Sequence, residues 1–248
     1  MSDEPIPAAT LVVVRERADG PPELLMVERA GGMAFAGGAL VFPGGRIDDH
    51  DRRLAKPFGC TDGAARVAAI RETIEETTVP VGVEPLPSSD DALAMQAALV
   101  DDCPFGELLD DAGLGLDLDA LTPFARWLPN FHVTRRFDTV FFLARAPAGE
   151  WAPSVIASEC SGAFWLTAAD ALERERGGDA RLIFPTRRNL ERLARFGSFA
   201  EARADAERHP VTCITPWVEQ RDDGLHVCIP DGIGYPVTSE PLETARRR

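Results

Sequence analysis

The chain has 248 residues, of which 45% are hydrophobic and 27% charged, a balance typical of a globular protein with a sizeable core. Its formal net charge of −14 argues against a duplex DNA-binding protein and against one that binds an anionic membrane surface. No segment approaches the roughly 20 apolar residues of a membrane span, and we identify no signal peptide. The five cysteines are widely spaced, which favours reduced thiols over a zinc site. These features predict a cytoplasmic protein.

The acidic residues are concentrated in one block. Between Glu72 and Ala125 the sequence contains thirteen acids and no Lys, Arg or His, so the rest of the chain is nearly neutral. Lysine occurs once, as Lys56, and nearly all positive charge therefore belongs to arginine. Arginine suits phosphate binding, although a general compositional bias accounts for most of these residues. Any function assigned to the chain has to explain at least part of the acidic block.

The N-terminal third predicts a sheet followed by a helix. Short apolar or β-branched runs indicate three neighbouring strands, at residues 10–14, 23–27 and 39–42. Pro43-Gly44-Gly45 then predicts a turn that needs permissive dihedral angles. A polar loop is expected over residues 48–63, and a helix over 64–79 that ends near Pro80.

The middle of the chain predicts more helices and two buried strands. Ser89 is the expected cap of a helix over 89–100, and short helical pieces broken by glycines are expected over 104–122. The buried strands are expected over 136–144 and 163–166.

The C-terminal part predicts two further helices and a hairpin. Thr167, with Asp170 three residues later, predicts a helix start, and Pro185-Thr186 predicts another. The hairpin is expected over 213–229, with its turn at Asp222-Asp223-Gly224. The mixed order of strands and helices, without a repeat, predicts one α/β domain over residues 1–248. Its two appendages are expected to be an acidic helical insert at about 88–121 and C-terminal helices with a hairpin at about 186–230.

The helix over 64–79 carries an arrangement of acids that suggests chemistry. At 100° per residue, Glu72, Glu75 and Glu76 fall on one stripe, nearly opposite the apolar residues Val67 and Ile70. Three carboxylates within one turn repel one another, and Arg71 is the one adjacent cation. One interpretation is a solvated acidic face. The other is a site for a divalent cation such as Mg²⁺, which takes carboxylate oxygens as ligands.

The sequence around this helix resembles the signature of the Nudix hydrolases, G-x5-E-x7-R-E-U-x-E-E-x-G-U, where U is aliphatic. Phe42-Pro43-Gly44-Gly45 leads into it, Asp51 stands at the first Glu position, and residues 71–76 read Arg-Glu-Thr-Ile-Glu-Glu. The interval from Asp51 to Arg71 is about twelve residues longer than in the signature, and an added loop is tolerated there. Thr78 replaces the late glycine, which affects the exit of the helix and not the acidic positions. The resemblance implies a Nudix-type α/β/α sandwich with a mixed sheet.

The resemblance also implies a reaction and a set of roles. Nudix enzymes hydrolyse a nucleoside diphosphate linked to another moiety, with Mg²⁺ or Mn²⁺. By position, Glu75 and Glu76 would hold the metal with the carbonyl of Gly44. Glu72 would bind metal through water or act as the base, and Arg71 would orient the carboxylates. A further carboxylate is expected from Asp51 or from Glu159, for which an ordinary exposed loop acid is an equally good interpretation.

A second, partial resemblance points to the coenzyme A diphosphatases and the acyl-coenzyme A branch with its bacterial relatives. The segment from Leu24 through Arg29-Ala30 and Gly38 to the Phe42–Gly45 run matches their upstream element in spacing. Arg29, Arg135 and Arg136 are candidate substrate-binding residues. For Arg135 and Arg136, a solvated strand edge is the competing interpretation.

Three hypotheses therefore remain. The first is a diphosphatase that converts coenzyme A or an acyl-coenzyme A into 3′,5′-ADP and (acyl-)phosphopantetheine. The second keeps the chemistry but takes ADP-ribose, NADH or a dinucleoside polyphosphate as substrate. The third is a Nudix fold that binds a ligand without turnover. The expected partner is a nucleotide-containing small molecule and neither nucleic acid nor membrane. The acidic insert is expected to form a homodimer surface or a lid.

Overall fold

A mixed eight-stranded sheet forms the centre of the computed structural model, which describes residues 4–31, 37–129, 136–156 and 160–246. Its strands are β1 (Ile6–Arg15), β2 (Glu23–Arg29), β3 (Leu40–Val41), β4 (Gly44–Arg46), β7 (Thr122–Trp127), β8 (Phe137–Arg145), β9 (Cys160–Thr167) and β10 (Cys213–Ile214). They follow the order β10-β7-β8-β1-β2-β3, with β4 paired to β1 and β9 paired to β2.

The central strand β1 organises this sheet. It runs parallel to β8 from Ile6 to Val14. Along its other edge, β4 pairs antiparallel with its first half and β2 with its last two residues. Successive side chains of β1 point to opposite faces, so Leu11 and Val13 pack in one apolar cluster and Val12 in another. The β-branched run that predicted this strand is therefore buried on both faces.

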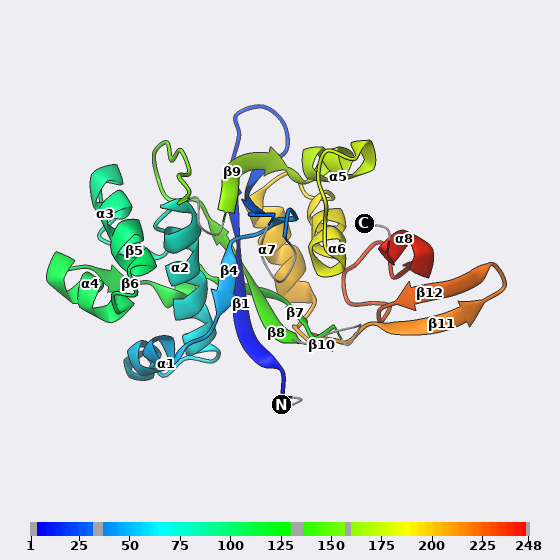
Figure 1. Ribbon diagram of the computed structural model, residues 1–248, viewed down its shortest axis with the longest axis horizontal. Helices are drawn as coiled ribbons and strands as arrows, with labels where there is room; N and C mark the ends of the chain where they lie inside the picture. The colour runs from blue at the N-terminus through cyan, green and yellow to red at the C-terminus, as the bar shows by residue number, and fades with distance from the viewer. Residues whose placement is uncertain (1–3, 32–36, 130–135, 157–159, 247–248) are drawn as a thin grey trace.

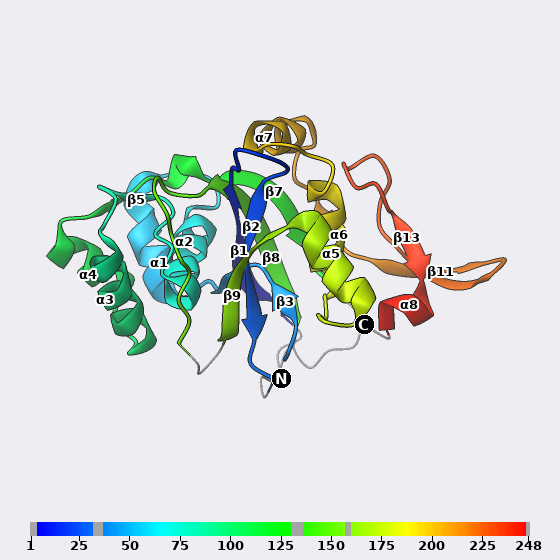
Figure 2. The ribbon, with the colours of Figure 1, turned by 90° about the horizontal axis from the view of Figure 1, so that it is seen from above.

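Helices cover both faces of the sheet, as Figures 1 and 2 show. The helices are α1 (Asp49–Ala55), α2 (Gly63–Thr77), α3 (Ser89–Val100), α4 (Phe105–Ala112), α5 (Ala168–Gly177), α6 (Phe184–Leu193), α7 (Phe199–Arg208) and α8 (Leu242–Arg246), with 3-10 turns at η1 (Lys56–Phe58) and η2 (Leu118–Ala120). α2 packs on one face, and α6 and α7 pack on the other. The predicted α/β/α arrangement with a mixed sheet is confirmed. Within the described residues, no helix has the length and apolar character needed to cross a membrane.

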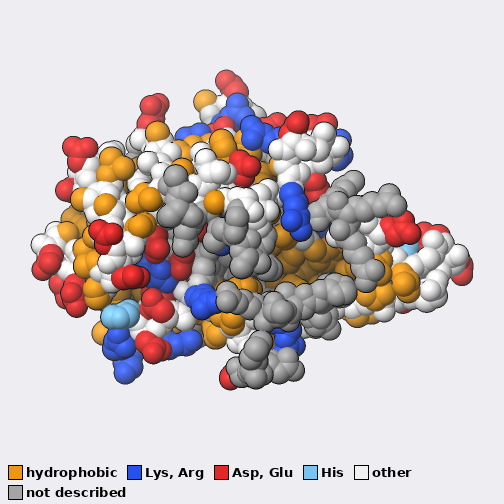
Figure 3. Space-filling model, viewed as in Figure 1, with side chains coloured by type: hydrophobic (Ala, Val, Ile, Leu, Met, Phe, Trp, Pro, Cys, Tyr) orange, Lys and Arg blue, Asp and Glu red, His pale blue; other side chains and the backbone are white. Residues whose placement is uncertain are grey.

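The acidic stretch after α2 packs against the outer side of that helix. It contains α3, α4, η2 and the small antiparallel pair β5 (Val83–Glu84) and β6 (Gly115–Leu116). Met95, Leu99 and Phe105 join the apolar cluster around α2, whereas the acids point outward. In the space-filling view, acidic side chains gather over α3 and α4 (Figure 3).

The C-terminal segment forms a separate three-stranded sheet of β11 (Trp217–Arg221), β12 (Gly224–Cys228) and β13 (Ser239–Pro241). β11 and β12 form the predicted hairpin, and the turn lies at Asp222-Asp223 as expected. The expected start of the hairpin at Cys213 is wrong, because Cys213 lies in β10 and pairs with Arg126 of the main sheet. The hairpin projects from the body of the molecule (Figure 1).

Several local predictions are wrong for identifiable reasons. The expected polar loop over 48–63 contains α1, because Asp48 and Asp51 form a reciprocal capping box. The expected turn at Pro43-Gly44-Gly45 continues into β4, because the edge of β1 is free to pair there. Ser88, not Ser89, caps α3. Ile183, not Pro185-Thr186, is the N-cap residue of α6.

Candidate active site

The three acids of α2 are largely buried and do not form a solvated face. The side chains of Glu72, Glu75 and Glu76 expose 14%, 24% and 4% of their surface. Such burial of like charges is unfavourable unless donors or cations compensate it. The interpretation as an ordinary solvated face is therefore wrong, and the compensating groups identify the site.

Gly44 and Gly45 of β4 approach the acids directly. The main-chain N–H of Gly44 donates to Glu76 Oε2 over 2.9 Å. A Cβ built on Gly45 would fall on the carboxylate of Glu72. A Cβ on Gly44 would strike the main chain of β1 at Ala9 and Thr10, and Gly44 has a φ of +157°. The missing side chains thus permit two close approaches, of Gly44 to β1 and of Gly45 to the carboxylate of Glu72.

Arg71 contacts most of the acidic cluster, by which we mean Asp51, Glu72, Glu75 and Glu76. Its Nε and NH2 donate to the two carboxylate oxygens of Asp51, each over 3.0 Å. NH1 lies 2.9 Å from Glu72 Oε1 and 3.1 Å from Glu75 Oε2. NH2 also donates to the carbonyl of Arg46 over 2.9 Å. One buried guanidinium therefore fixes α1, β4 and two of the acids of α2 relative to one another.

Asp51 acts as the partner of this arginine in the structure. It is 1% exposed, and besides Arg71 it accepts the main-chain N–H of Asp48 at Oδ2. Asp51 stands at the first Glu position of the signature and is a predicted additional carboxylate of the site. The structure brings it into the cluster, with both oxygens occupied by protein donors.

Burial sets the protonation behaviour of the cluster. Burial raises the pKa of Glu72 to about 7, although the charge of Arg71 acts to lower it. Burial likewise raises the pKa of Asp51, against the hydrogen bond and charge of Arg71. Burial alone would lower the pKa of Arg71, but its hydrogen bond to Asp51 and the charge of Glu72 outweigh this effect and raise it. Arg71 is therefore a permanent cation, while the pKa of Glu72 lies near neutral pH.

Arg29 is a candidate substrate-binding residue whose side chain lies near the acids. Its NH1 lies 4.0 Å from Glu76 Oε1. Its Nε is buried and has no hydrogen-bond partner among the described residues. Arg136 directly precedes β8, and its carbonyl accepts the N–H of Ile6 over 2.8 Å. Arg135 and Glu159 lie outside the described residues.

The donor set of the cluster fits a hard divalent cation. It consists of three carboxylates, which supply oxygen ligands of the kind that Mg²⁺ and Mn²⁺ prefer. In the described part of the chain, no three acidic, His or Cys side chains lie close enough together to hold an ion as they stand. The contacts to Arg71 and to Gly44 N–H hold the carboxylates instead.

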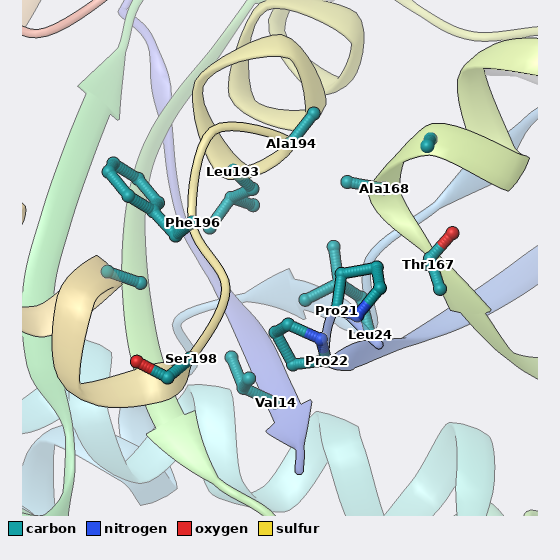
Figure 4. A pocket seen from close by; sticks show the side chains of 12 residues that line it. Val14, Pro21, Pro22, Leu24, Thr167, Ala168, Leu193, Ala194, Phe196 and Ser198 are labelled. Carbon is teal, nitrogen blue, oxygen red and sulfur yellow. The ribbon is translucent and has the colours of Figure 1, made fainter. Parts of the chain in front are cut away.

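A small pocket lies elsewhere and does not carry this chemistry. It lies between the β1–β2 connection, the start of α5 and the end of α6 (Figure 4). Its lining includes Val14, Pro22, Leu193 and Phe196 and contains no charged side chain. An uncharged pocket of this kind offers nothing to a pyrophosphate, so the acids of α2 remain the candidate site.

Sequence reasoning missed one side chain that touches the site helix. Gln96 of α3 is 2% exposed and donates through Nε2 to the carbonyl of Glu75 over 3.0 Å. A signal was present, because Gln96 lies on the same stripe as Ala92, Met95 and Leu99. A lone amide on an apolar stripe indicates a buried hydrogen-bond partner.

Comparisons with known proteins agree with this site. No family model matches the chain. A curated relative from Caenorhabditis elegans, which is named as a nudix hydrolase, is 28% identical over 174 residues, covering 69% of this chain and 55% of that protein. The chain thus spans about half the length of this relative. A crystal structure of a Nudix hydrolase from Alicyclobacillus acidocaldarius is 30% identical, with a TM-score of 0.71, and the match covers 81% of this chain and 96% of that one. Together with the Gly44-Gly45 strand and the acidic helix, this similarity shows that the chain belongs to the Nudix hydrolase family.

Proposed function

We propose that the chain hydrolyses a pyrophosphate bond in a nucleoside diphosphate linked to another moiety, with Mg²⁺ or Mn²⁺ as cofactor. The observation that carries this proposal is the burial of three acids on α2, with Glu76 on Gly44 and Glu72 on Gly45 of β4 and Glu75 paired with Arg71. Glu75, Glu76 and the Gly44 carbonyl would hold the metal, with Glu72 bound to it through water or acting as the base. When bound, the metal neutralises the pyrophosphate and lowers the pKa of the attacking water.

The residues of the chain have distinct tasks in this reaction. Glu72, whose pKa lies near 7, takes a proton from the attacking water. The water oxygen forms a bond to one phosphorus, the bridging P–O bond breaks, and two phosphate monoesters leave. Arg71 holds the carboxylates of Glu72 and Glu75 through NH1, while its other edge is fixed on Asp51. This second contact fixes the orientation of the guanidinium.

Coenzyme A or an acyl-coenzyme A is the proposed substrate, giving 3′,5′-ADP and (acyl-)phosphopantetheine. Support comes from the spacing of Arg29, Ala30 and Gly38 ahead of the Phe42–Gly45 run. The guanidinium of Arg29, whose NH1 lies 4.0 Å from Glu76 Oε1, would supply donors for a phosphate oxygen. Arg135, Arg136 and Glu159 stay predicted contributors to the site.

A substrate panel tests this proposal. Purified protein with Mg²⁺ or Mn²⁺ is incubated with coenzyme A, acetyl-coenzyme A, ADP-ribose, NADH and a dinucleoside polyphosphate, and the products are separated by chromatography. We expect the highest kcat/KM for a coenzyme A substrate, and a loss of several orders of magnitude in Glu76→Gln. A preference for ADP-ribose, NADH or the dinucleoside polyphosphate would overturn the substrate assignment. Binding without turnover of any compound would overturn the enzymatic proposal.

A further inference from the structure

We propose that Gln96 is a positioning residue, through which the acidic insert holds the last turn of α2 and the carboxylates of Glu75 and Glu76. This inference rests on the proposed function, because it assigns those carboxylates to the reaction. Gln96 lies outside the signature and touches main-chain atoms, so it would act through α2.

The end of α2 depends on partners from other parts of the chain. The last four carbonyls of a helix lack partners within it and need others. The carbonyl of Ile74 accepts the N–H of Thr78 over 2.8 Å. The carbonyl of Thr77 accepts the N–H of Ser154 over 3.0 Å, and that of Glu75 accepts the amide of Gln96. Two of these carbonyls are thus satisfied by segments remote in sequence.

The backbone at the exit of α2 is strained. Thr78 has a φ of +65° and a ψ of 0°, a left-handed conformation that a β-branched residue rarely adopts. Such a conformation persists where surrounding contacts over-determine it. The family signature has glycine here, which adopts this conformation without strain. Because this chain has threonine, its helix end needs external contacts to keep its geometry.

Gln96 supplies a contact that joins three segments. Its Nε2 donates to the carbonyl of Glu75 and also to the carbonyl of Ser154, over 2.8 Å. The main-chain N–H of Ser154 in turn donates to the carbonyl of Thr77 at the end of α2. One amide of α3 therefore ties α2 to the segment between β8 and β9. Gln96 is 2% exposed, so water cannot take over its two bonds freely.

The carboxylates beside this turn have little tolerance for its movement. Glu76 Oε2 accepts the N–H of Gly44, and Glu75 Oε2 accepts NH1 of Arg71. Both side chains start from the turn whose carbonyl Gln96 holds. Loss of the Gln96 contact would let the turn loosen, and it would spoil the relative placement of the two metal ligands. Groups that orient metal ligands in this way typically contribute 10–100-fold to metal affinity or activity.

The test compares Gln96→Met with Met95→Ala. Gln96→Met keeps the length of the side chain but removes both donors, whereas Met95→Ala removes apolar packing from the same buried stripe of α3. Mn²⁺ affinity of the full chain is measured without nucleotide from the EPR signal of free Mn²⁺, and thermal stability is measured in parallel. We expect the Kd for Mn²⁺ to rise about 10-fold or more in Gln96→Met. In Met95→Ala we expect a comparable fall in Tm with an unchanged Kd.

The outcomes separate this inference from the proposed function. If the unmodified protein neither binds Mn²⁺ nor hydrolyses the panel, the proposed function fails. If it does both, and Gln96→Met matches Met95→Ala in Mn²⁺ affinity, Gln96 is merely structural and the inference is overturned. Should Gln96→Met not fold, Gln96→Asn replaces it, since its shorter amide reaches at most one of the two carbonyls. An intermediate Kd in that variant supports the inference, and an unchanged Kd contradicts it.

Discussion

Replacing Gly45 with alanine should separate catalysis from folding. Gly45 lies in β4 without a positive φ, so its backbone accepts alanine. The new Cβ would fall on Cδ and both oxygens of Glu72. Because these atoms end a flexible side chain, we expect Glu72 to swing away while the backbone stays in place. The free energy of unfolding should change by less than about 1 kcal/mol. The kcat should fall by about 10²–10⁴, the usual contribution of a positioned base.

Gly44→Ala is the matched variant, because its Cβ meets main chain instead of a side-chain end. It would strike the carbonyl of Ala9 and lie 2.7 Å from the Cα of Thr10. We expect β4 to shift from β1, with a loss of about 1–3 kcal/mol in the free energy of unfolding. Urea unfolding and steady-state kinetics at saturating Mg²⁺ measure both variants. A wild-type kcat in Gly45→Ala would refute the placement of Glu72 as the base. An equal loss of stability in both variants would refute the steric argument.

Two further substitutions test the electrostatics of the cluster. Arg71→Met leaves the carboxylate of Asp51 buried without its cation, and urea unfolding should show a loss of about 3–5 kcal/mol; a loss below 1 kcal/mol would contradict the paired burial. For Glu72, the folded-state pKa of about 7 exceeds the ordinary 4.5, so its ionisation destabilises the fold as pH rises from 4.5 to 7. In EDTA, the stability of wild type relative to Glu72→Gln should therefore fall between pH 5 and pH 8, by at most about 3 kcal/mol. Parallel stability curves over that range would show that burial does not raise the pKa of Glu72.

The parts of the fold that the sequence predicts well are those with strong local signals. The β-branched run at residues 10–14 and the periodic helix over 64–79 correspond to β1 and α2 within a few residues. Elements that form because another part of the chain pairs with them cannot be predicted from local sequence in this way. β4 consists of Gly44-Gly45-Arg46, which has no strand propensity, and exists because β1 offers a free edge. α1 lies in a polar stretch, and its capping box uses aspartate where glutamate or glutamine is the usual signal.

In the candidate site, too, the sequence predicts the local features and not those that depend on packing between elements. The spacing of Arg71, Glu72, Glu75 and Glu76 on one helix predicts that these residues act together, and the helix delivers them together. Spacing could not show that one guanidinium serves Asp51 as well as Glu72 and Glu75, or that Glu76 is nearly inaccessible. Those properties depend on how α1 and β4 pack on α2, over separations of 20 and 32 residues. Such packing cannot be predicted from the local sequence.

The acidic block of the sequence has two physical origins. Three of its thirteen acids belong to the candidate site on α2, where burial makes them costly. The other ten follow α2, and all but the half-buried Asp117 are exposed, so solvent screens them. Some lie at helix N-termini, where a negative charge is favourable: Asp90 and Asp91 start α3, and Glu107 starts α4. In the described residues, the hydrogen bond from this insert to a carbonyl of α2 is donated by the neutral Gln96 to Glu75, and no acid takes part in it. The charge of the insert is therefore a property of its outer surface, whereas its link to the site lies on the apolar side that faces α2.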